Sequence, residues 1–484
     1  MNFPLDVLDE PLLEFGNGGR AIDPRLGLME HGPLQPGTGD KVRLAVIGTK
    51  DTVEGFERFV ERCRTGIPAP QGRLANLRPP FPGLGNANPF RCSFEVETGG
   101  TAVLPRRDIE RILREKDNDA AVRAAVDLFA NHALAVHESS ARPDVVMFAL
   151  PTELIERVVN DSVTADAEDE PLPDHVPAGQ PLDFRDLLKA RTLHHRCPSQ
   201  IVWPTTWDDS LKISRKLNGR PRRTQDPATR AWNLFNALFY KAGRVPWRLH
   251  TPEGGLKTSY CGISFYRDET GQNLLTSSAQ MFDERGRGLI LKGGRARTER
   301  NERHPYLTRE DAYDLLRRAL DAYRMHHRHY PARLVLYKTS RFNPGEVAGF
   351  EAALEEAQVD ARDFVWIQEG SPLMLMREGD YPPLRGSVLE FGRETMLYTR
   401  GSVPFFKTYP GQRVPKPLLL RPYQQDSTNH ELAAETLALT KMNWNSTQFD
   451  GSTPITLKAA RQVGRILKHV PQGLEVPGDY RYFI

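Results

Sequence analysis

Two short runs of basic residues are the first features of the sequence that could do chemistry. Lys212–Arg223 ends in Gly-Arg-Pro-Arg-Arg, and Lys292–Arg303 reads Lys-Gly-Gly-Arg-Ala-Arg-Thr-Glu-Arg-Asn-Glu-Arg. The formal net charge is only +3, from 65 basic and 62 acidic residues, so local clustering and not total charge indicates a polyanionic partner. The alternative is that both runs are solvated surface loops.

Other residue groups are similar to known sites only superficially. Gly254–Thr258 is similar to a phosphate-binding loop, but it lacks the adjacent Gly-Lys and precedes a strand instead of following one. His194–Cys197 and His326–His329 contain metal-ligand residue types; both lie in basic helix ends, so we expect exposed histidines that are solvated or face phosphate. The four cysteines include no CxxC pair, which argues against a zinc ribbon or a disulfide framework.

The first half of the chain is predicted to form a parallel α/β sheet, because strand patterns alternate there with helix patterns. We predict strands at Val42–Gly48, Asp144–Leu150 and Gln200–Trp203, and helices at Glu54–Cys63, Ala120–Ala135, Phe184–Ala190 and Pro227–Gly243. The last helix is well marked, since Asp226 suits an N-cap and Pro227 the first turn.

The second half has a different order of elements. Strand patterns at Tyr260–Tyr266, Asn273–Phe282 and Gly288–Lys292 form a predicted meander, joined by turn residues at 268–271 and 283–286. A helix capped by Thr308 and Asp311, a strand at Arg333–Tyr337, a helix begun by Asn343 and Pro344, and a strand at Phe364–Ile367 follow. This order is typical of a ribonuclease-H-like fold.

Length and composition fit two such domains. The chain has 484 residues, of which 39% are apolar and 26% charged, enough for two or three globular domains. No stretch approaches the roughly 20 consecutive apolar residues of a membrane span, and Met1–Asp6 lacks the order of a signal peptide. We therefore expect a cytoplasmic protein without membrane association.

The carboxylates that a ribonuclease-H-like nuclease needs are missing from their expected places. Two-metal cleavage requires acids from the first strand, a later strand end and a helix. The first strand carries Ser264 at its centre, and the later strand end, Leu336–Ser340, contains no acid. We expect Asp268, at a turn, and Glu346, in a helix, to be surface residues. The fold is thus predicted without its hydrolytic site.

At this point the sequence resembles a known family. The motifs that carry the resemblance are Lys241–Trp247, Gly262–Tyr266, Lys338–Phe342 with Glu346, Leu439–Asn445, Glu10–Gly16 and Gly27–Met29. Together they are similar to prokaryotic Argonautes of the short class, which contain MID and PIWI domains. Short Argonautes are typically inactive as nucleases, which agrees with Ser264 and Thr339 at the aspartate positions.

The resemblance also implies a binding site for the 5′ phosphate of a guide. Arg185 and Lys189 are spaced i,i+4 and so emerge from one helix face, while Gln200 and Lys241 match later positions of the family motif. Arg185 departs from the usual tyrosine or histidine. In related proteins the terminal carboxylate, here that of Ile484, acts with the glutamine to hold Mg²⁺ against the phosphate. The alternative is that the apolar C-terminus is docked for packing alone.

The resulting prediction is an N-terminal extension (1–40), a Rossmann-like MID domain (41–245) and an inactive PIWI domain (246–484). The resemblance implies a short 5′-phosphorylated guide RNA, a single-stranded DNA target, and a separate APAZ-domain partner that carries a sirtuin-like, TIR or nuclease effector for defence against plasmids and phages. Two alternatives stay open: a self-sufficient guided nuclease that uses Asp268 or Glu346, and a nucleic-acid-binding module without a guide.

Overall fold

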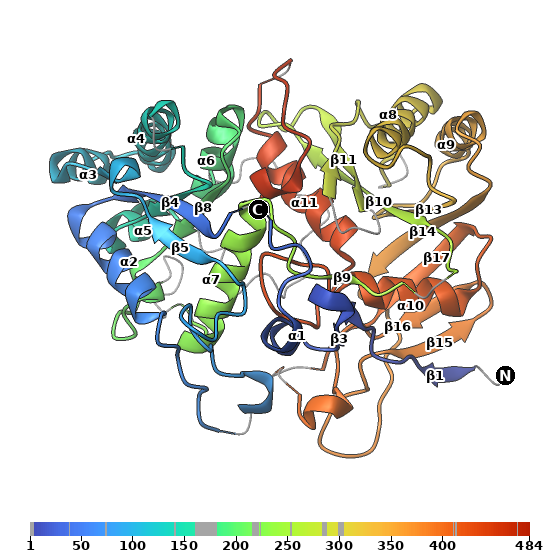
Figure 1. Ribbon diagram of the computed structural model, residues 1–484. Helices are drawn as coiled ribbons and strands as arrows, with labels where there is room; N and C mark the ends of the chain where they lie inside the picture. The colour runs from blue at the N-terminus through green and yellow to red at the C-terminus, as the bar shows by residue number, and fades with distance from the viewer. Residues whose placement is uncertain are drawn as a thin grey trace.

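The computed structural model describes residues 4–484 except 38, 73–74, 140–141, 160–181, 215–221, 223, 252–253, 283–287, 299–303, 410, 412–413 and 472. Most of the first basic run, the end of the second, and the turn predicted at 283–286 therefore lie outside the described residues. In the described part of the chain, no helix is both long and apolar enough to cross a membrane. Figure 1 shows two lobes, with the C-terminus between them.

The first lobe is built on a parallel sheet with strand order β5-β4-β7-β8. The central strand β4 (Lys41–Gly48) pairs with β5 (Ser93–Val96) and β7 (Val145–Ala149), and β8 (Ser199–Val202) pairs with β7. The short strand β6 (Ala102–Val103) also pairs with β4. Every residue of β7 is buried, as expected for a parallel strand covered on both faces. The predicted α/β class is confirmed for this lobe.

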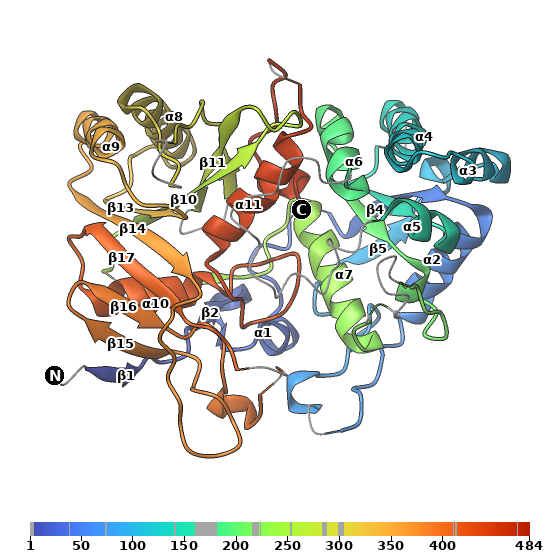
Figure 2. The same cartoon turned by 180° about the vertical axis from the view of Figure 1, so that it is seen from behind.

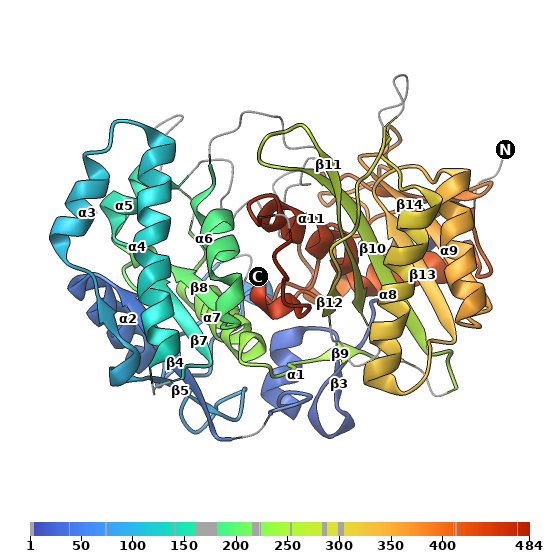
Figure 3. The ribbon, with the colours of Figure 1, turned by 90° about the horizontal axis from the view of Figure 1, so that it is seen from above.

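Helices cover both faces of this sheet (Figure 3). Their bounds are α2 (Lys50–Arg62), α3 (Arg106–Leu113), α4 (Asn118–Glu138), α5 (Thr152–Val158), α6 (Phe184–Thr192) and α7 (Pro227–Lys241). Side chains of α2 and α7 share one apolar core with Val42, Leu44 and Val46, while α3 to α6 share a second core with Ala45 and Ile47. The alternation of strand side chains between two faces thus produces a three-layer lobe.

The second lobe contains a nine-stranded mixed sheet with order β1-β15-β16-β17-β14-β13-β10-β11-β12. The central strands β10 (Thr258–Arg267), β13 (Arg333–Lys338) and β14 (Ala361–Glu369) are parallel. The remaining strands are antiparallel to their neighbours: β11 (Leu274–Phe282), β12 (Gly288–Ile290), β15 (Ser387–Phe391), β16 (Glu394–Leu397) and β17 (Leu418–Gln424). The predicted meander and the strands that follow it are all present.

Helices lie on both faces of this sheet as well (Figure 2). On one face, α8 (Arg309–His327) and α9 (Pro344–Glu356) pack on β10 and β13. On the other face, α10 (Asn429–Leu439) and α11 (Ile455–Leu467) belong to the same core as α7 of the first lobe. The two lobes therefore share one apolar core across α7, α10 and α11.

The N-terminal residues contribute to the second lobe. Strand β1 (Leu5–Val7) pairs with β15 at the edge of the nine-stranded sheet. Strands β2 (Leu13–Glu14) and β3 (Arg20–Ala21) form a small sheet with β9 (Arg248–Leu249), and α1 (Pro24–His31) follows. The segment predicted as an N-terminal extension is thus paired with strands far along the chain. The two boundaries between the three predicted segments stay predictions.

Candidate nucleic-acid interface

Two buried lysines lie near each other at the junction of the lobes, and one of them, Lys189, contacts the C-terminal residue. Lys189 lies on α6, which begins at the N-cap Asp183, whose side chain accepts a hydrogen bond from the Asp186 amide at 2.9 Å. Lys241 is the last residue of α7, which begins at the N-cap Asp226. Lys189 is 3% exposed and Lys241 is 1% exposed. Because lysine is almost never fully buried without a reason, this pair marks a candidate site.

The four residues predicted to bind phosphate are brought together with the chain end. Lys189 Nζ donates to the carbonyl oxygen of Ser199 at 2.6 Å and to a terminal oxygen of Ile484 at 2.5 Å. Lys241 Nζ donates to Gln200 Oε1. Arg185 Nη2 donates to the carbonyl oxygen of Phe483 at 3.3 Å. The structure therefore places Arg185, Lys189, Gln200, Lys241 and Ile484 in one cluster.

Positive charge accumulates in this cluster. Burial lowers the pKa of Lys189 well below its ordinary value, and the nearby Lys241 ammonium and Arg185 guanidinium lower it further. Asp186 offsets part of this charge, since it accepts from Arg185 Nη1 at 2.9 Å and lies 3.4 Å from Arg465 Nε of α11. An anion placed here would relieve the repulsion among the buried cations.

The C-terminal residues are held in place by hydrogen bonds as well as by packing. Tyr480, Phe483 and Ile484 are all at most 2% exposed, and Tyr480 donates to Gln462 Oε1 at 2.8 Å. Gly243, beside the Arg481 side chain of the tail, has φ of +84°, a backbone conformation that favours glycine. The apolar terminus is thus packed, and its last oxygen also faces Lys189.

The oxygen atoms of the cluster suit Mg²⁺ by type. Magnesium prefers hard oxygen ligands and usually combines one or two protein ligands with phosphate oxygens and water. Ile484 supplies a terminal carboxylate and Gln200 an amide oxygen, although each already accepts a hydrogen bond from a lysine. Among the described residues, no group of three or more His, Cys, Asp or Glu side chains could hold a metal ion alone. A cation here would complete its coordination with oxygens from a bound phosphate or from water.

A second location of interest lies at the carboxyl ends of β10 and β13. The backbone N–H of Thr339 donates to Ile263 at 3.4 Å, so Thr339 lies beside Ser264 on the adjacent strand. Ser264 is 4% exposed. A Cβ on Gly262 would lie 2.5 Å from the Thr456 carbonyl carbon, which shows how closely the first turn of α11 covers β10. Two residues with neutral hydroxyl side chains thus lie side by side in sequence register, next to the part of β10 that α11 covers.

Comparison with known proteins relates the chain to one fold. No protein-family model and no curated protein matches the chain. The structure of Clostridium butyricum Argonaute bound to a guide DNA and a 19-mer target DNA matches with a TM-score of 0.64 at 14% identity, covering 100% of this chain and 55% of that one. Drosophila Piwi matches with a TM-score of 0.61 at 12% identity, covering 99% and 56%.

The chain has the fold of the Argonaute and Piwi proteins. The structure of A. aeolicus Argonaute also matches, with a TM-score of 0.57 at 15% identity, covering 99% of this chain and 55% of that one. The chain therefore spans little more than half the length of these structures. The Argonaute fold predicted from the sequence motifs is confirmed.

Within the Argonaute fold, one of the two acids considered for catalysis lies elsewhere than predicted. Asp268 lies at the β10–β11 turn and accepts from Asn273 Nδ2 at 2.6 Å, as a turn residue does. Glu346 was expected at the surface, and this prediction is wrong, because its side chain is 0% exposed. It pairs with Lys338 and accepts from the Asn343 amide at 2.8 Å in a capping box.

Sequence reasoning overlooked a third acid, Glu369 at the end of β14. Glu369 lies at the same strand parity as Val365 and Ile367, which belong to the core on the α11 side of the sheet, so it points to that face. Arg461 of α11 forms an ion pair with it. The signal available in the sequence was an acid two residues beyond the strand predicted at Phe364–Ile367, but the pairing with a helix far along the chain was not readable there.

The prediction of exposed histidines is also wrong in part. His195 is 5% exposed and His327 is 8% exposed. His195 packs beside His137 of α4, with ring centroids 6.0 Å apart, and burial lowers its pKa to about 4, so it is neutral near neutral pH. His327 stacks on Tyr323, with centroids 4.2 Å apart. Both rings pack against aromatic neighbours at helix ends.

The described parts of the two basic runs differ from each other. In the first run, Arg222 is 7% exposed and lies 5.6 Å from the ring of Trp203, so it is a packed cation and not a solvated one. In the second run, Arg295 and Arg297 are exposed. Only the second run therefore presents described arginines to solvent.

Proposed function

We propose that the chain binds the 5′ phosphate of a short guide RNA and uses the guide to recognise a single-stranded DNA target. The observation that carries the proposal is the convergence of Lys189, Gln200, Lys241 and the C-terminal residue Ile484 at one buried point. The Clostridium butyricum structure contains a guide DNA and a target DNA, and another match, Aa-Ago, has an externally bound siRNA. Those ligands belong to those proteins and support the proposal only through the fold.

Each residue of the cluster would contribute differently to binding a terminal phosphate. Lys189 and Lys241 would donate charge-assisted hydrogen bonds to phosphate oxygens, and Gln200 would turn its amide toward the same group. Arg185 would hold the tail through Phe483 and add long-range positive charge. Mg²⁺, held by the Ile484 carboxylate and Gln200, would supply a divalent charge between tail and phosphate.

We further propose that the chain itself does not cut. Ser264 and Thr339 would offer neutral hydroxyls where two-metal hydrolysis needs carboxylates, and Arg461 neutralises Glu369 nearby. The biological output would then come from a separate APAZ-domain partner with a sirtuin-like, TIR or nuclease effector. That partner, a role in defence against plasmids and phages, and a cytoplasmic location follow from the family resemblance.

Binding of matched guides tests the phosphate pocket. Lys189→Ala, Gln200→Ala and Lys241→Ala should each weaken binding of a 5′-phosphorylated RNA by about tenfold to a hundredfold, because a hydrogen bond to a charged group contributes about 1.5–3 kcal/mol. Binding of the 5′-hydroxyl RNA should change much less. Lys50→Ala, which removes an exposed lysine at the start of α2, is the control. Equal losses with both RNAs would exclude phosphate recognition by these residues.

A further inference from the structure

Arg341 lies between β13 and α9, and its side chain is exposed. Within the part of the chain that the structure describes, its guanidinium makes no ion pair and no hydrogen bond. The guanidinium carbon instead lies over the ring of Trp366 on β14, 5.2 Å from the ring centroid. A guanidinium stacked on an aromatic face keeps its N–H edges free for phosphate or carboxylate oxygens. Arg341 is therefore a positioned cation with free hydrogen-bond donors.

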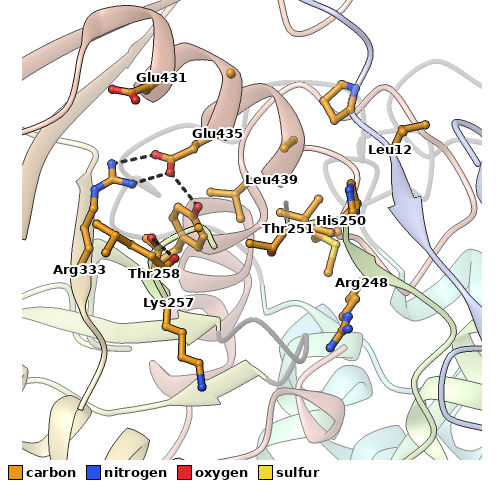
Figure 4. Close-up of a pocket in the computed structure, with 18 of the residues that line it drawn as sticks. Leu12, Arg248, His250, Thr251, Lys257, Thr258, Arg333, Glu431, Glu435 and Leu439 are labelled. Atoms are coloured by element: carbon orange, nitrogen blue, oxygen red, sulfur yellow. Dashed lines mark hydrogen bonds and ion pairs between the residues drawn. The ribbon is translucent and has the colours of Figure 1, made fainter. Parts of the chain in front are cut away.

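Arg333, at the start of β13, has a different environment. Its Nε donates to Asp363 Oδ2 at 2.8 Å, and its Nη1 donates to Glu435 Oε1 at 2.6 Å (Figure 4). The arginine at the amino end of β13 is thus neutralised by carboxylates of the chain itself. The arginine beyond the carboxyl end is held by an indole ring, which leaves its charge available to a ligand.

Trp366 also holds a second cation. Arg421 on β17 pairs in register with Trp366, and its guanidinium carbon lies 4.7 Å from the ring centroid. Arg421 Nε lies 3.1 Å from Glu394 Oε1, so its charge is balanced. Two guanidiniums and one carboxylate leave the Trp366 group (Arg341, Trp366 and Arg421, with Glu394) with a net positive charge. This charge favours an anionic ligand.

An exposed aromatic ring lies beside the Trp366 group. Strand β17 has a β-bulge opposite Phe364 and Val365, in which Tyr423 is the extra residue. The ring of Tyr423 lies 5.9 Å from that of Phe342, which follows Arg341 and is 9% exposed. Tyr423 itself is 43% exposed. The bulge thus presents a flat ring to solvent close to a guanidinium that lacks a carboxylate partner.

The Trp366 group lies close to the Ser264–Thr339 pair but on the other face of the sheet. Trp366 pairs in register with Lys338, the residue before Thr339. Its ring packs against the core that contains α8 and α9, whereas α11 covers the opposite face. Since neighbouring strands are about 4.8 Å apart, a nucleic-acid strand at Thr339 needs only a short continuation around the sheet edge to reach Arg341.

A cation beside an exposed aromatic ring suits a single-stranded nucleic acid. The cation binds a backbone phosphate, and the ring stacks on a base. In a duplex the bases stack on each other, so they are not free to stack on Tyr423. An acidic protein segment is the other class of ligand for a free guanidinium, but the exposed ring favours a base.

We propose that Arg341 and Tyr423 hold an unpaired stretch of nucleic acid that continues beyond the guide–target duplex. Arg341 binds a phosphate, Tyr423 stacks on a base, and Trp366 positions the guanidinium of Arg341. The proposal rests on the proposed function, which brings a guide and a target to the chain, and adds a contact outside the 5′-phosphate pocket. The 3′ end of a guide and the flanks of a target share this chemistry, and the experiment distinguishes them.

Binding of strands with unpaired extensions tests the proposal. Fluorescence anisotropy compares four cases: a target that ends flush with the guide, a target with an unpaired flank at its 5′ end, a target with one at its 3′ end, and a guide with an unpaired 3′ tail. We expect an extension to raise the affinity by about fivefold or more, as one base stacked on an aromatic ring does. The extension that raises the affinity identifies the strand.

Arg341→Ala and Tyr423→Ala should each remove most of this gain and leave binding of the flush target nearly unchanged. Arg341→Ala should also reduce the slope of log K against log salt concentration by about one, as expected for one lost phosphate contact. Arg341→Lys keeps the charge without the flat guanidinium, so it should restore the slope. Arg106→Ala on α3 and Phe405→Ala remove an exposed arginine and a ring that is 52% exposed, and these controls should keep the full gain.

The outcomes separate this site from the guide pocket. No gain from any unpaired extension, or a gain that both alanine variants keep, would overturn the proposal and leave the proposed function standing. An unguided, 5′-hydroxyl single-stranded DNA should lose affinity in Arg341→Ala and Tyr423→Ala but not in Lys189→Ala, so it tests the site even if the pocket fails its own test. Loss of polyglutamate binding in Arg341→Ala, with DNA binding unchanged, would overturn the proposal in favour of an acidic protein ligand.

Discussion

Buried charges have different neighbours in two regions of the molecule. One region is the lysine cluster at the C-terminus, and the other is the carboxyl end of the central strands. At the strand end, Lys338 and Glu346 are both 0% exposed and paired, and Arg461 balances Glu369. In the cluster, Lys189 faces a terminal oxygen of Ile484 but lies close to two further cations. In one region each of these charges has an opposite partner, and in the other Lys189 has a carboxylate partner but also two cationic neighbours.

This difference in neighbouring charges distinguishes the ion pairs at the strand end from the candidate ligand site at the lysine cluster. Burial lowers the pKa of Lys338 to about 8, while Glu346 acts in the opposite direction. For Lys189, Lys241 and Arg185 reinforce the effect of burial, so its pKa falls well below the ordinary value. Unbalanced buried charge costs stability and persists where a ligand or function compensates for it. The comparison therefore favours an anion site at the cluster and none among the buried charges of the strand end.

The largest expected effect concerns cleavage. The purified chain, loaded with guide RNA and target DNA in Mg²⁺ or Mn²⁺, should show no guided cleavage, because Ser264 and Thr339 cannot hold two metals as carboxylates do. Ser264→Asp with Thr339→Asp should not restore cutting while Arg461 pairs with Glu369. Denaturing gels of labelled target give the measurement. Metal-dependent, guide-directed products from the wild-type chain would promote the nuclease alternative.

A stability contrast comes next. Glu346→Ala should cost about 3–5 kcal/mol of unfolding free energy, because it leaves Lys338 buried without its partner. Lys189→Met, measured without guide, should cost less, about 1–3 kcal/mol, because it removes the buried donor to Ser199 and Ile484 but also removes one of several crowded cations while keeping the apolar stem. Urea unfolding of both variants checks this. Similar losses would show that Lys189 is a structural lysine like Lys338.

Extension of the C-terminus should have an intermediate effect. A residue added after Ile484 moves the terminal carboxylate away from Lys189, and deletion of residues 482–484 removes it. Either change should reduce affinity for a 5′-phosphorylated guide about tenfold and remove most of its dependence on Mg²⁺. Titrations with and without Mg²⁺, using the 5′-hydroxyl guide as control, would measure this. Unchanged affinity and metal dependence would leave packing as the sole role of the tail.

The smallest expected effect is a pH dependence of guide binding. A phosphate dianion favours the ammonium form of Lys189, so its pKa is higher in the complex than in the free protein, where it is lowered. The affinity that this proton contributes is complete below the free-protein pKa and is lost as the pH rises through the pKa of the complex. Affinity for the 5′-phosphorylated guide should fall severalfold with rising pH, with net proton uptake on binding measured by calorimetry in two buffers.

The same titration contains its own control. The 5′-hydroxyl guide lacks the dianion, so its affinity should depend on pH much less over the same range. Lys189→Met should flatten the curve of the phosphorylated guide. If the variant keeps the wild-type pH dependence, Lys189 is not the group that takes up the proton.

Much of the architecture was readable from local patterns. The helix from Pro227 to Lys241 begins at Asp226, as its capping residues predicted, and the strands β4, β7, β10 and β13 lie where apolar runs indicated them. These features depend on residues close together in the chain, where capping bonds and side-chain alternation act. The cluster of Arg185, Lys189, Gln200, Lys241 and Ile484 was predicted from a family motif, and its assembly depends on the fold.

What the sequence by itself determined is therefore the set of elements and the absence of acids at Ser264 and Thr339, since both are properties of short segments. The tertiary structure decided which charges meet. Glu346 was predicted at the surface, but in the folded chain it is buried, pairs with Lys338 and forms a capping box. Glu369 pairs with Arg461, which lies 92 positions away on another element. The burial and pairing of a charge depend on neighbours brought by the fold, because desolvation and Coulomb attraction act through space and not along the chain.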